Sequence, residues 1–260
     1  MEMPLKILTI MNTKTLIVVL GPTAIGKTAF SIHLAKHYNT EIISADSRQF
    51  YKELLIGAAP PSQFELSEVK HHFIHHLSVS DNYSVGKYEE DAIKEIEELF
   101  TKKDKLILVG GSGLYIDSIC KGLDKIPEVS EHIREEISEK YKIEGIKFLQ
   151  KEIEEKDSVY FNEVDINNPQ RLIRALEVIY STEKPFSSFR SKEDKKRNFN
   201  IIKIGLEMER EILYNRINQR VDIMLKNGLL KEVESLIQYK DKNSLQTVGY
   251  KELFEYINEN

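Results

Sequence analysis

The residues best suited to chemistry lie near the amino terminus, in the stretch Gly21-Pro22-Thr23-Ala24-Ile25-Gly26-Lys27-Thr28. This G-x-x-x-x-G-K-[ST] pattern follows an apolar run and precedes a helical pattern, which is the context in which it binds phosphate. The glycines let successive backbone amides point inward, and the positive end of the following helix adds to this anion site. Lys27 supplies a mobile positive charge, and the Thr28 hydroxyl suits a phosphate-bound Mg²⁺. The stretch therefore predicts a site for a diphosphate or triphosphate.

A polar cluster, Asp46-Ser47-Arg48-Gln49, follows a short apolar run at residues 41–45 that predicts a buried strand. Open α/β sheets place their ligand sites just beyond the carboxyl ends of their strands. A further strand is predicted at 105–109, leading into the glycine-rich segment 110–115 and another helix. This alternation of strands and helices indicates a parallel sheet. The strand at 105–109 ends in glycine where P-loop NTPases usually carry an Mg²⁺-binding aspartate, which weakens an ATPase or GTPase interpretation.

The sequence changes in character between residues 123 and 199, where charged and helical patterns dominate. Its clearest helix is 169–180, for which Pro169 is a favourable first residue. The apolar stripe of this helix consists of Leu172, Ala175, Leu176 and Ile179. Arg171 and Arg174 lie three positions apart and share a different face. The basic run from Lys184 to Arg197 fits either a solvated loop or a local basic face.

After residue 199 the pattern returns to a strand, at 200–206, and then to a long helix with Arg210 and Arg216 near its start. The predicted fold class is therefore α/β, with a P-loop core whose parallel sheet is flanked by helices and with a mostly helical insertion. We expect the core to comprise residues 1–122 and 200–260, and the insertion to comprise residues 123–199.

The composition is that of a soluble globular protein, with 260 residues, of which 41% are hydrophobic and 30% are charged. A single cysteine, Cys120, excludes an internal disulfide and a cysteine-based zinc site, and a reducing cytoplasm is the simplest setting. No apolar run approaches the length needed to cross a bilayer. The net charge of −5 argues against broad polyanion binding, although a local basic face is enough to bind nucleic acid.

Four histidines occur in the run His71-His72-Phe73-Ile74-His75-His76. On a helix, pairs four residues apart would have metal-ligand spacing. The apolar residues among them favour a strand, and no carboxylate stands at metal-ligand spacing beside them. Structural histidines are therefore favoured over a metal site.

With these motifs in view, the chain resembles the tRNA dimethylallyltransferase family, also called the tRNA isopentenyltransferases. Four motifs carry the resemblance: GPTAIGKT at 21–28, ISADSRQFY at 43–51, LVGGSGLY at 108–115 and NPQRLIRALEVI at 168–179. Further signatures are RVDIML at 220–225 with Gly228-Leu229, and Val248-Gly249-Tyr250. The phosphate loop alone is shared by many families, but the motifs together span most of the chain in the expected order.

The resemblance implies that a dimethylallyl group moves from dimethylallyl diphosphate to N6 of adenosine 37, beside the tRNA anticodon, and that diphosphate leaves. The leaving diphosphate needs its growing charge neutralised, which loop amides, Lys27, Mg²⁺ and an arginine can do. The exocyclic amine loses a proton as the new bond forms, and a positioned carboxylate can accept it. By resemblance this carboxylate is Asp46, for which a helix cap or an Mg²⁺ partner remains the alternative.

The resemblance also implies a set of site residues. Catalytic roles fall to Asp46, Ser112 and Arg216. Diphosphate would be bound by residues 21–28 and Arg210, with Mg²⁺ held through the phosphate at Thr28. The residues implied to bind tRNA are Asp46, Ser47, Arg48, Gln49, Ser112, Arg134, Gln170, Arg171, Leu172, Ile173 and Arg174. Ser112 is equally compatible with a helix N-cap. We expect the protein to act as a monomer, with tRNA and dimethylallyl diphosphate as its partners.

The sequence departs from the family pattern at three places. Ser112 replaces the commoner threonine and keeps the hydroxyl, and His75 stands where many members carry aspartate. Family members usually continue past the Gly-Tyr-Lys stretch with a basic helix, whereas this sequence ends at Asn260. Because that helix would supply positive charge, we expect reduced tRNA affinity without it.

Two other classes of function remain open on the sequence. A P-loop kinase of a nucleoside or small metabolite would bind ATP in the phosphate loop and use Asp46 to activate an acceptor hydroxyl. An RNA-binding module without turnover would keep the basic face but transfer nothing. The fate of a labelled prenyl donor or of labelled ATP separates these possibilities from prenyl transfer.

Overall fold

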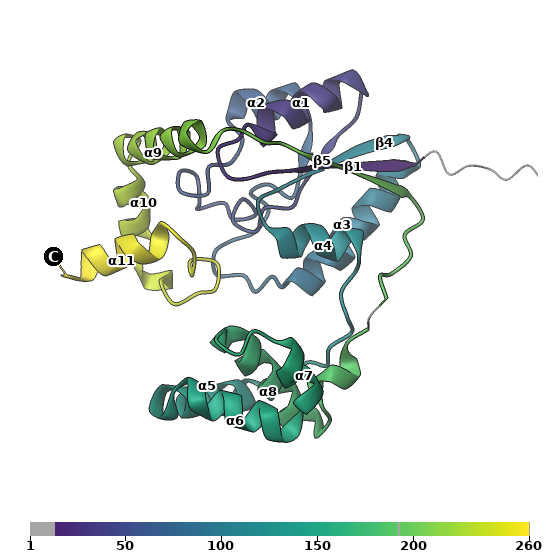
Figure 1. The fold of residues 1–260 in the computed structure, drawn as a ribbon. Helices are drawn as coiled ribbons and strands as arrows, with labels where there is room; N and C mark the ends of the chain where they lie inside the picture. The colour runs from purple at the N-terminus through teal and green to yellow at the C-terminus, as the bar shows by residue number, and fades with distance from the viewer. Residues whose placement is uncertain (1–13, 192, 260) are drawn as a thin grey trace, which may run out of the picture. The chain divides into compact units, whose positions relative to one another are not determined.

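The computed structural model describes residues 14–191 and 193–259 and divides the chain into two compact units. The first unit comprises Met1–Gly122 and Lys196–Asn260, and the second comprises Leu123–Lys195 (Figure 1). Residue 192 of the predicted basic run lies outside the described residues. No helix in the described part of the chain is long and apolar enough to cross a membrane.

A five-stranded parallel sheet forms the centre of the first unit, in the order β3-β2-β4-β1-β5. Its strands are β1 (Thr15–Leu20), β2 (Ile42–Ser44), β3 (His71–His72), β4 (Lys105–Val109) and β5 (Asn200–Gly205). Successive residues of β1 point to opposite faces, so Leu16 and Val18 join one core while Ile17 and Val19 join another. Burial on both faces explains why the sequences of β1 and β4 are almost continuously apolar.

Helices cover both faces of this sheet. On one face, Ile32 and Ala35 of α1 (Lys27–His37) pack against the β1 side chains Ile17 and Val19. On the other face lie α3 (Val85–Phe100) and α4 (Gly113–Cys120) (Figure 1). The unit also contains α2 (Gln63–Glu68), α9 (Arg210–Lys226), α10 (Leu229–Ser235), the short 3-10 helix η2 (Ile237–Tyr239) and α11 (Tyr250–Glu259). The predicted α/β class with a parallel sheet is confirmed.

In the described residues of the second unit, the regular secondary structure consists of helices joined by loops. Its elements are α5 (Glu131–Glu144), α6 (Ile146–Lys156), α7 (Ser158–Glu163), α8 (Pro169–Thr182) and the 3-10 helix η1 (Phe186–Phe189). The predicted apolar stripe of α8 lies in the core of this unit, which confirms that face of the helix. The helix begins where the Asn168 side chain accepts a hydrogen bond from the Arg171 amide, with Pro169 in the first turn.

The chain re-enters the first unit at Lys196, slightly before the predicted boundary, because Arg197 is anchored there. Its guanidinium donates to the carbonyls of Ile119 and Ser118 at 2.8 and 2.6 Å and pairs with Glu89 at 2.9 Å. Both charged side chains of this pair are nearly buried. Arg197 is therefore a structural residue and not part of a solvated or RNA-facing basic run.

The parallel sheet brings the carboxyl ends of β1, β2 and β4 to one edge, and β2 and β4 approach closely there. The Ala45 amide donates to the Val109 carbonyl at 2.7 Å. A side chain at Gly110 would place its Cβ 2.3 Å from the Ala45 carbonyl oxygen. Only glycine fits at this position, so the residues after β2 and β4 can lie side by side.

We predict that Gly110→Ala destabilises the first unit by about 2 kcal/mol or more, because the new methyl group would overlap backbone atoms that cannot move aside. Gly113→Ala is the matched control, since nothing lies within 4 Å of its added Cβ at the start of α4. Urea unfolding of both variants measures the difference. Equal stabilities of the two variants would contradict the close approach of β2 and β4.

Candidate active site

The phosphate loop connects β1 to α1, as predicted. Gly26 occupies the cap position of α1 with φ 105°, in the left-handed region that glycine favours. Because glycine has no side chain to cap the helix, the first amides of α1 stay open to an anion. The Lys27 ammonium folds back over the loop and donates to the carbonyls of Gly21 and Pro22, both at 2.8 Å.

Asp46 and Gln49 share a small cavity with Lys27 and Thr28. The cavity has a volume of about 40 Å³. Its lining is completed by Ser44, Pro61, His71, Ile74, Val109, Gly110 and Gly111. One Asp46 carboxylate oxygen accepts from the Arg48 amide at 3.1 Å, and the other lies 3.1 Å from the position that a Cβ on Gly111 would take. Residues predicted from two separate motifs therefore meet at one edge of the sheet.

Ser47 and Ser112 link the loops that follow β2 and β4. The Ser112 hydroxyl lies 3.1 Å from the Ser47 hydroxyl and accepts from the Ser47 amide at 3.2 Å. Ser112 occupies the cap position of α4, but its side chain makes no capping hydrogen bond. Ser112 is therefore the N-cap residue by position, as the helix-cap alternative predicts, but its hydroxyl is directed to the Asp46 loop instead of to the amides of α4.

Arg48 and Gln49 are both held by backbone carbonyls. The Arg48 guanidinium donates to the carbonyls of Asn243 and Ser244 at 2.8 Å and of Gln246 at 3.3 Å. These hydrogen bonds attach the Asp46 loop to the C-terminal part of the unit. Arg48 therefore has a structural role in addition to the tRNA contact predicted for it. The Gln49 amide donates to the Ala59 carbonyl at 3.2 Å while it lines the Asp46 cavity.

The two arginines predicted on α9 differ in their surroundings. A guanidinium nitrogen of Arg216 lies 4.0 Å from the position that a Cβ on Gly26 would take, so this exposed side chain reaches the phosphate loop. Arg210 instead donates to the Tyr214 hydroxyl at 3.0 Å and stacks over the Tyr214 ring. Arg216 therefore reaches the phosphate loop, whereas the Arg210 side chain contacts Tyr214 on the same helix.

Arg220 is the site residue that the sequence analysis missed. Burial lowers the pKa of Arg220, and the nearby Asp46 carboxylate opposes that shift. Burial likewise lowers the pKa of Lys27, with Asp46 raising it and Arg220 lowering it further. Arg220 therefore lies within electrostatic range of both groups. It opens the RVDIML motif four residues after Arg216, a spacing that puts both arginines on one helix face and could have revealed it.

A half-apolar groove of about 340 Å³ lies beside these arginines. Its polar members include Arg216, Gln219, Arg220 and Asn227. Its apolar members are Leu55, Ile56, Ala59, Ile223 and Met224. The groove can hold a short hydrocarbon with an anionic group at its arginine end.

The remaining predicted tRNA residues lie on α5 and α8 of the second unit. Arg134, Gln170 and Arg171 are exposed. Arg174 pairs with Glu177 at 3.0 Å, and Ile173 is partly buried against the core of the unit. Leu172 is fully buried in that core, which corrects its assignment as a tRNA contact through its side chain.

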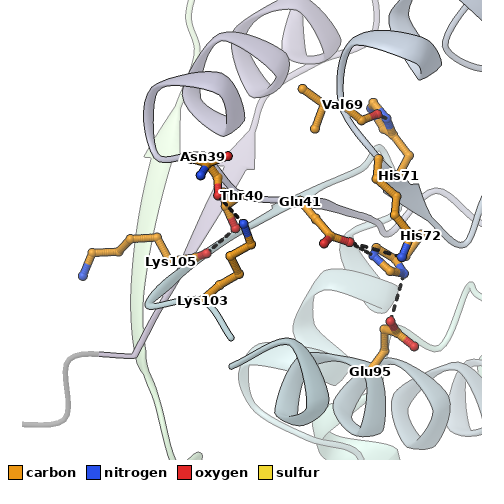
Figure 2. Close-up of polar contacts among 10 residues, drawn as sticks. Asn39, Thr40, Glu41, Val69, His71, His72, Glu95, Lys103 and Lys105 are labelled. Atoms are coloured by element: carbon orange, nitrogen blue, oxygen red, sulfur yellow. Dashed lines mark hydrogen bonds and ion pairs between the residues drawn. The ribbon is translucent and has the colours of Figure 1, made fainter. Parts of the chain in front are cut away.

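The four histidines do not form a metal site. His72 lies between two carboxylates, with Nε2 2.6 Å from Glu41 and Nδ1 3.0 Å from Glu95, on opposite sides of the ring (Figure 2). His71 contacts the Val69 carbonyl at 2.8 Å and lines the Asp46 cavity. Within residues 14–191 and 193–259 no group of three or more His, Cys, Asp or Glu side chains could hold a metal ion. The Thr28 hydroxyl and the Asp46 carboxylate line one cavity, and both are oxygen ligands of the kind that a phosphate-bound divalent ion takes.

Burial lowers the pKa values of His71, His75 and His76, so the folded protein resists protonating them. The unfolded chain binds these protons near pH 6.5. We predict that the free energy of unfolding falls by up to about 1 kcal/mol between about pH 7.5 and about pH 5.5, because rings that keep part of their solvent contact lose only part of their hydration. His75→Phe removes a ring nitrogen, Nε2, that is buried without a hydrogen-bond partner, and should reduce that loss in urea unfolding. The exposed His37→Gln serves as the control, and an unchanged loss in His75→Phe would contradict the explanation.

The family model and the relatives that match this chain all point to one family. The family model described as IPP transferase matches residues 49–260. The tRNA dimethylallyltransferase of Flavobacterium johnsoniae is 52% identical over 250 residues, covering 94% of this chain and 81% of that protein. The tRNA dimethylallyltransferase 1 of Bacteroides thetaiotaomicron is 48% identical over 243 residues, covering 94% of this chain and 79% of that protein.

Solved structures agree with this result. The full-length tRNA isopentenylpyrophosphate transferase of Bacillus halodurans has a TM-score of 0.64 and 36% identity, covering 95% of this chain and 78% of that one. A eukaryotic dimethylallyltransferase acting on tRNA has a TM-score of 0.75 and 26% identity, covering 95% of this chain and 64% of that one.

Proposed function

Because this chain belongs to the IPP transferase family, the family of the tRNA dimethylallyltransferases, we propose that it prenylates tRNA. The reaction transfers a dimethylallyl group from dimethylallyl diphosphate to N6 of adenosine 37, beside the anticodon. A bond forms between N6 and the first prenyl carbon, the bond from that carbon to the diphosphate oxygen breaks, and N6 loses one proton. The protein acts as a monomer in the cytoplasm.

The first unit supplies the groups that stabilise the leaving diphosphate. Negative charge grows on the departing oxygens, and preorganised donors lower the barrier most. The open amides of α1, the Lys27 ammonium and the guanidinium of Arg220 form a positive surface, with Arg216 at its rim. Mg²⁺ supplies further charge neutralisation when bound to the diphosphate. Thr28 is the side chain that would hold it, with Asp46 nearby.

Asp46 is the group that accepts the proton from N6. An adenine amine is a weak nucleophile, so a carboxylate within reach lowers the barrier as the proton leaves. Gln49 and Ser112 lie beside Asp46 with polar groups that can bind the edge of the base. The groove of Leu55, Ile56, Ile223 and Met224 holds the dimethylallyl tail next to Arg220.

The second unit binds the tRNA. A base stacked in a loop must be extruded before an active site can reach it, so the flanking backbone has to be gripped. Arg134, Gln170 and Arg171 offer exposed polar and charged groups for phosphate contacts. Arg174 would add a further contact once it leaves Glu177.

The observation that carries this proposal is the cavity in which Lys27 and Thr28 of the phosphate loop meet Asp46 and Gln49. The test incubates the protein with Mg²⁺, unmodified tRNA and either prenyl-labelled dimethylallyl diphosphate or γ-phosphate-labelled ATP. Prenyl label in tRNA is the expected result. Phosphoryl transfer from ATP to a nucleoside would instead indicate a kinase, and tRNA binding without transfer would indicate a binding module.

We predict that Asp46→Asn lowers the rate of prenyl transfer by about 10²-fold to 10⁴-fold, the usual contribution of a general base. Inorganic diphosphate should still bind, because the amide keeps the shape of the side chain and Lys27 is unchanged. Calorimetry with diphosphate and single-turnover transfer measure the two effects. Asp117→Asn on α4 is the control, since that exposed carboxylate pairs with Lys121. Loss of diphosphate binding in Asp46→Asn would reassign Asp46 to the phosphate site.

We predict that replacing Arg171 and Arg174 together by alanine weakens tRNA binding and flattens its salt dependence. Each lost phosphate contact on a single-stranded loop should reduce the slope of log K against log salt by about 0.7. Arg171 should account for more of the loss, because Arg174 already pairs with Glu177. The exposed Lys151→Ala on α6 is the control. A slope equal to that of the unchanged protein would remove this face from the tRNA site.

A further inference from the structure

A half-buried carboxylate on α10, Glu232, holds the loop at residues 55–57, which leads toward the active site. Glu232 accepts hydrogen bonds from the backbone amides of Leu55 and Ile56 at 2.9 and 2.8 Å on one oxygen. Its other oxygen accepts from the Gly57 amide at 3.0 Å and from the Tyr250 hydroxyl at 2.6 Å. Because four donors bind this one carboxylate, it holds the backbone of residues 55–57 in place, and we call this set of contacts the clamp.

Tyr250 completes this clamp from the start of α11. Its side chain is 1% exposed and packs directly on the turn at Gly57, where an added Cβ would lie 2.6 Å from three atoms of the phenol. Burial raises the pKa of Tyr250, and its hydrogen bond to Glu232 raises it further, so the hydroxyl stays a donor. Gly57, Glu232 and Tyr250 therefore fix the path of the loop from both sides.

The other end of this loop, at Ala59, contacts two site residues, Gln49 and Arg220. The Ala59 carbonyl accepts a hydrogen bond from the side-chain amide of Gln49 at 3.2 Å and one from the Arg220 guanidinium at 3.5 Å. Ala59 itself has φ 43°, a left-handed conformation that an alanine adopts only when its surroundings enforce it. The Ala59 amide donates to the Ile56 carbonyl at 2.9 Å, which joins this turn to the clamp at residues 55–57.

The C-terminal segment is joined to the site loops at a second point. Arg48, next to Asp46, donates to the carbonyls of Asn243, Ser244 and Gln246, a few residues before Tyr250. The Ser244 hydroxyl in turn donates to the Val79 carbonyl at 2.7 Å. The segment that carries the Val248-Gly249-Tyr250 signature is thus attached to both loops of the active site.

We propose that Glu232 and Tyr250 are positioning residues for prenyl transfer, acting through the amides of residues 55–57 and the Ala59 carbonyl to hold Gln49 and Arg220 in place. This inference rests on the proposed function, in which Arg220 faces the diphosphate and Gln49 faces the base. Neither residue touches the substrates. Their effect is exerted through the loop that both hold.

The test compares Glu232→Gln with Arg220→Gln and with the double variant. Glu232→Gln keeps the size of the side chain but places an amide NH₂ against backbone donors, so the loop loses part of its clamp. We expect kcat/KM for the prenyl donor to fall about tenfold, because small displacements of site residues carry large rate costs. In the Arg220→Gln background, the added Glu232→Gln change should cost clearly less than in the unchanged protein, because only the contact to Gln49 is left to be displaced.

Two further variants and one experimental condition separate this effect from a loss of stability. Glu234→Gln on the same helix is exposed and should leave the kinetics unchanged. Tyr250→Phe keeps the ring and three of the four hydrogen bonds on Glu232, so its effect should be smaller than that of Glu232→Gln. All rates are measured well below each variant's unfolding temperature.

A purely structural role predicts a lower unfolding temperature with unchanged kcat/KM in the folded protein, and that result would overturn the inference. Additive losses in the double variant would overturn it as well. Calorimetry with Mg²⁺ and inorganic diphosphate provides a readout without turnover, in which Glu232→Gln should weaken binding about tenfold through Arg220. If the unchanged protein transfers no prenyl group, the proposed function fails, whereas this binding measurement still decides the inference.

Discussion

The proposed reaction depends on a charge arrangement in which two half-buried cations, Lys27 and Arg220, lie within electrostatic range of one carboxylate, Asp46. Burial makes each positive charge costly, and the two cations raise that cost for each other. Asp46 offsets only part of it, so the site keeps a surplus of positive charge. In the reaction that we propose, a diphosphate supplies the missing negative charge, and the same groups stabilise it as it leaves carbon.

The scaffold explains how these groups come together from distant parts of the sequence. Parallel pairing puts the ends of β1, β2 and β4 at one edge, and Gly110 lets the Asp46 loop lie against the segment after β4. The helix α9 then brings Arg216 and Arg220 to the phosphate loop, and α10 and α11 hold the loop at residues 55–59. Lys27, Asp46 and Arg220 each contact backbone groups, which helps to preorganise the site.

Much of this arrangement could be predicted from the sequence, because the signals were local. The phosphate loop, the strands at 105–109 and 200–205 and the buried stripe of α8 all follow from spacing and composition. The strand order, the tasks of Arg48 and Arg197 and the clamp at Glu232 could not be predicted, because they depend on pairings between distant segments. Leu172 was misassigned because a family motif marks both core and surface positions of a helix, and only the packing separates them.

A crystal structure of the protein with Mg²⁺ and diphosphate would show directly whether Asp46 faces the bound anion. We expect the anion on the open amides of α1, within hydrogen-bonding distance of Lys27 and Arg220, with the Asp46 carboxylate facing it across the cavity. A diphosphate bound elsewhere, with Asp46 turned away from the phosphate loop, would show that these groups do not form the active site.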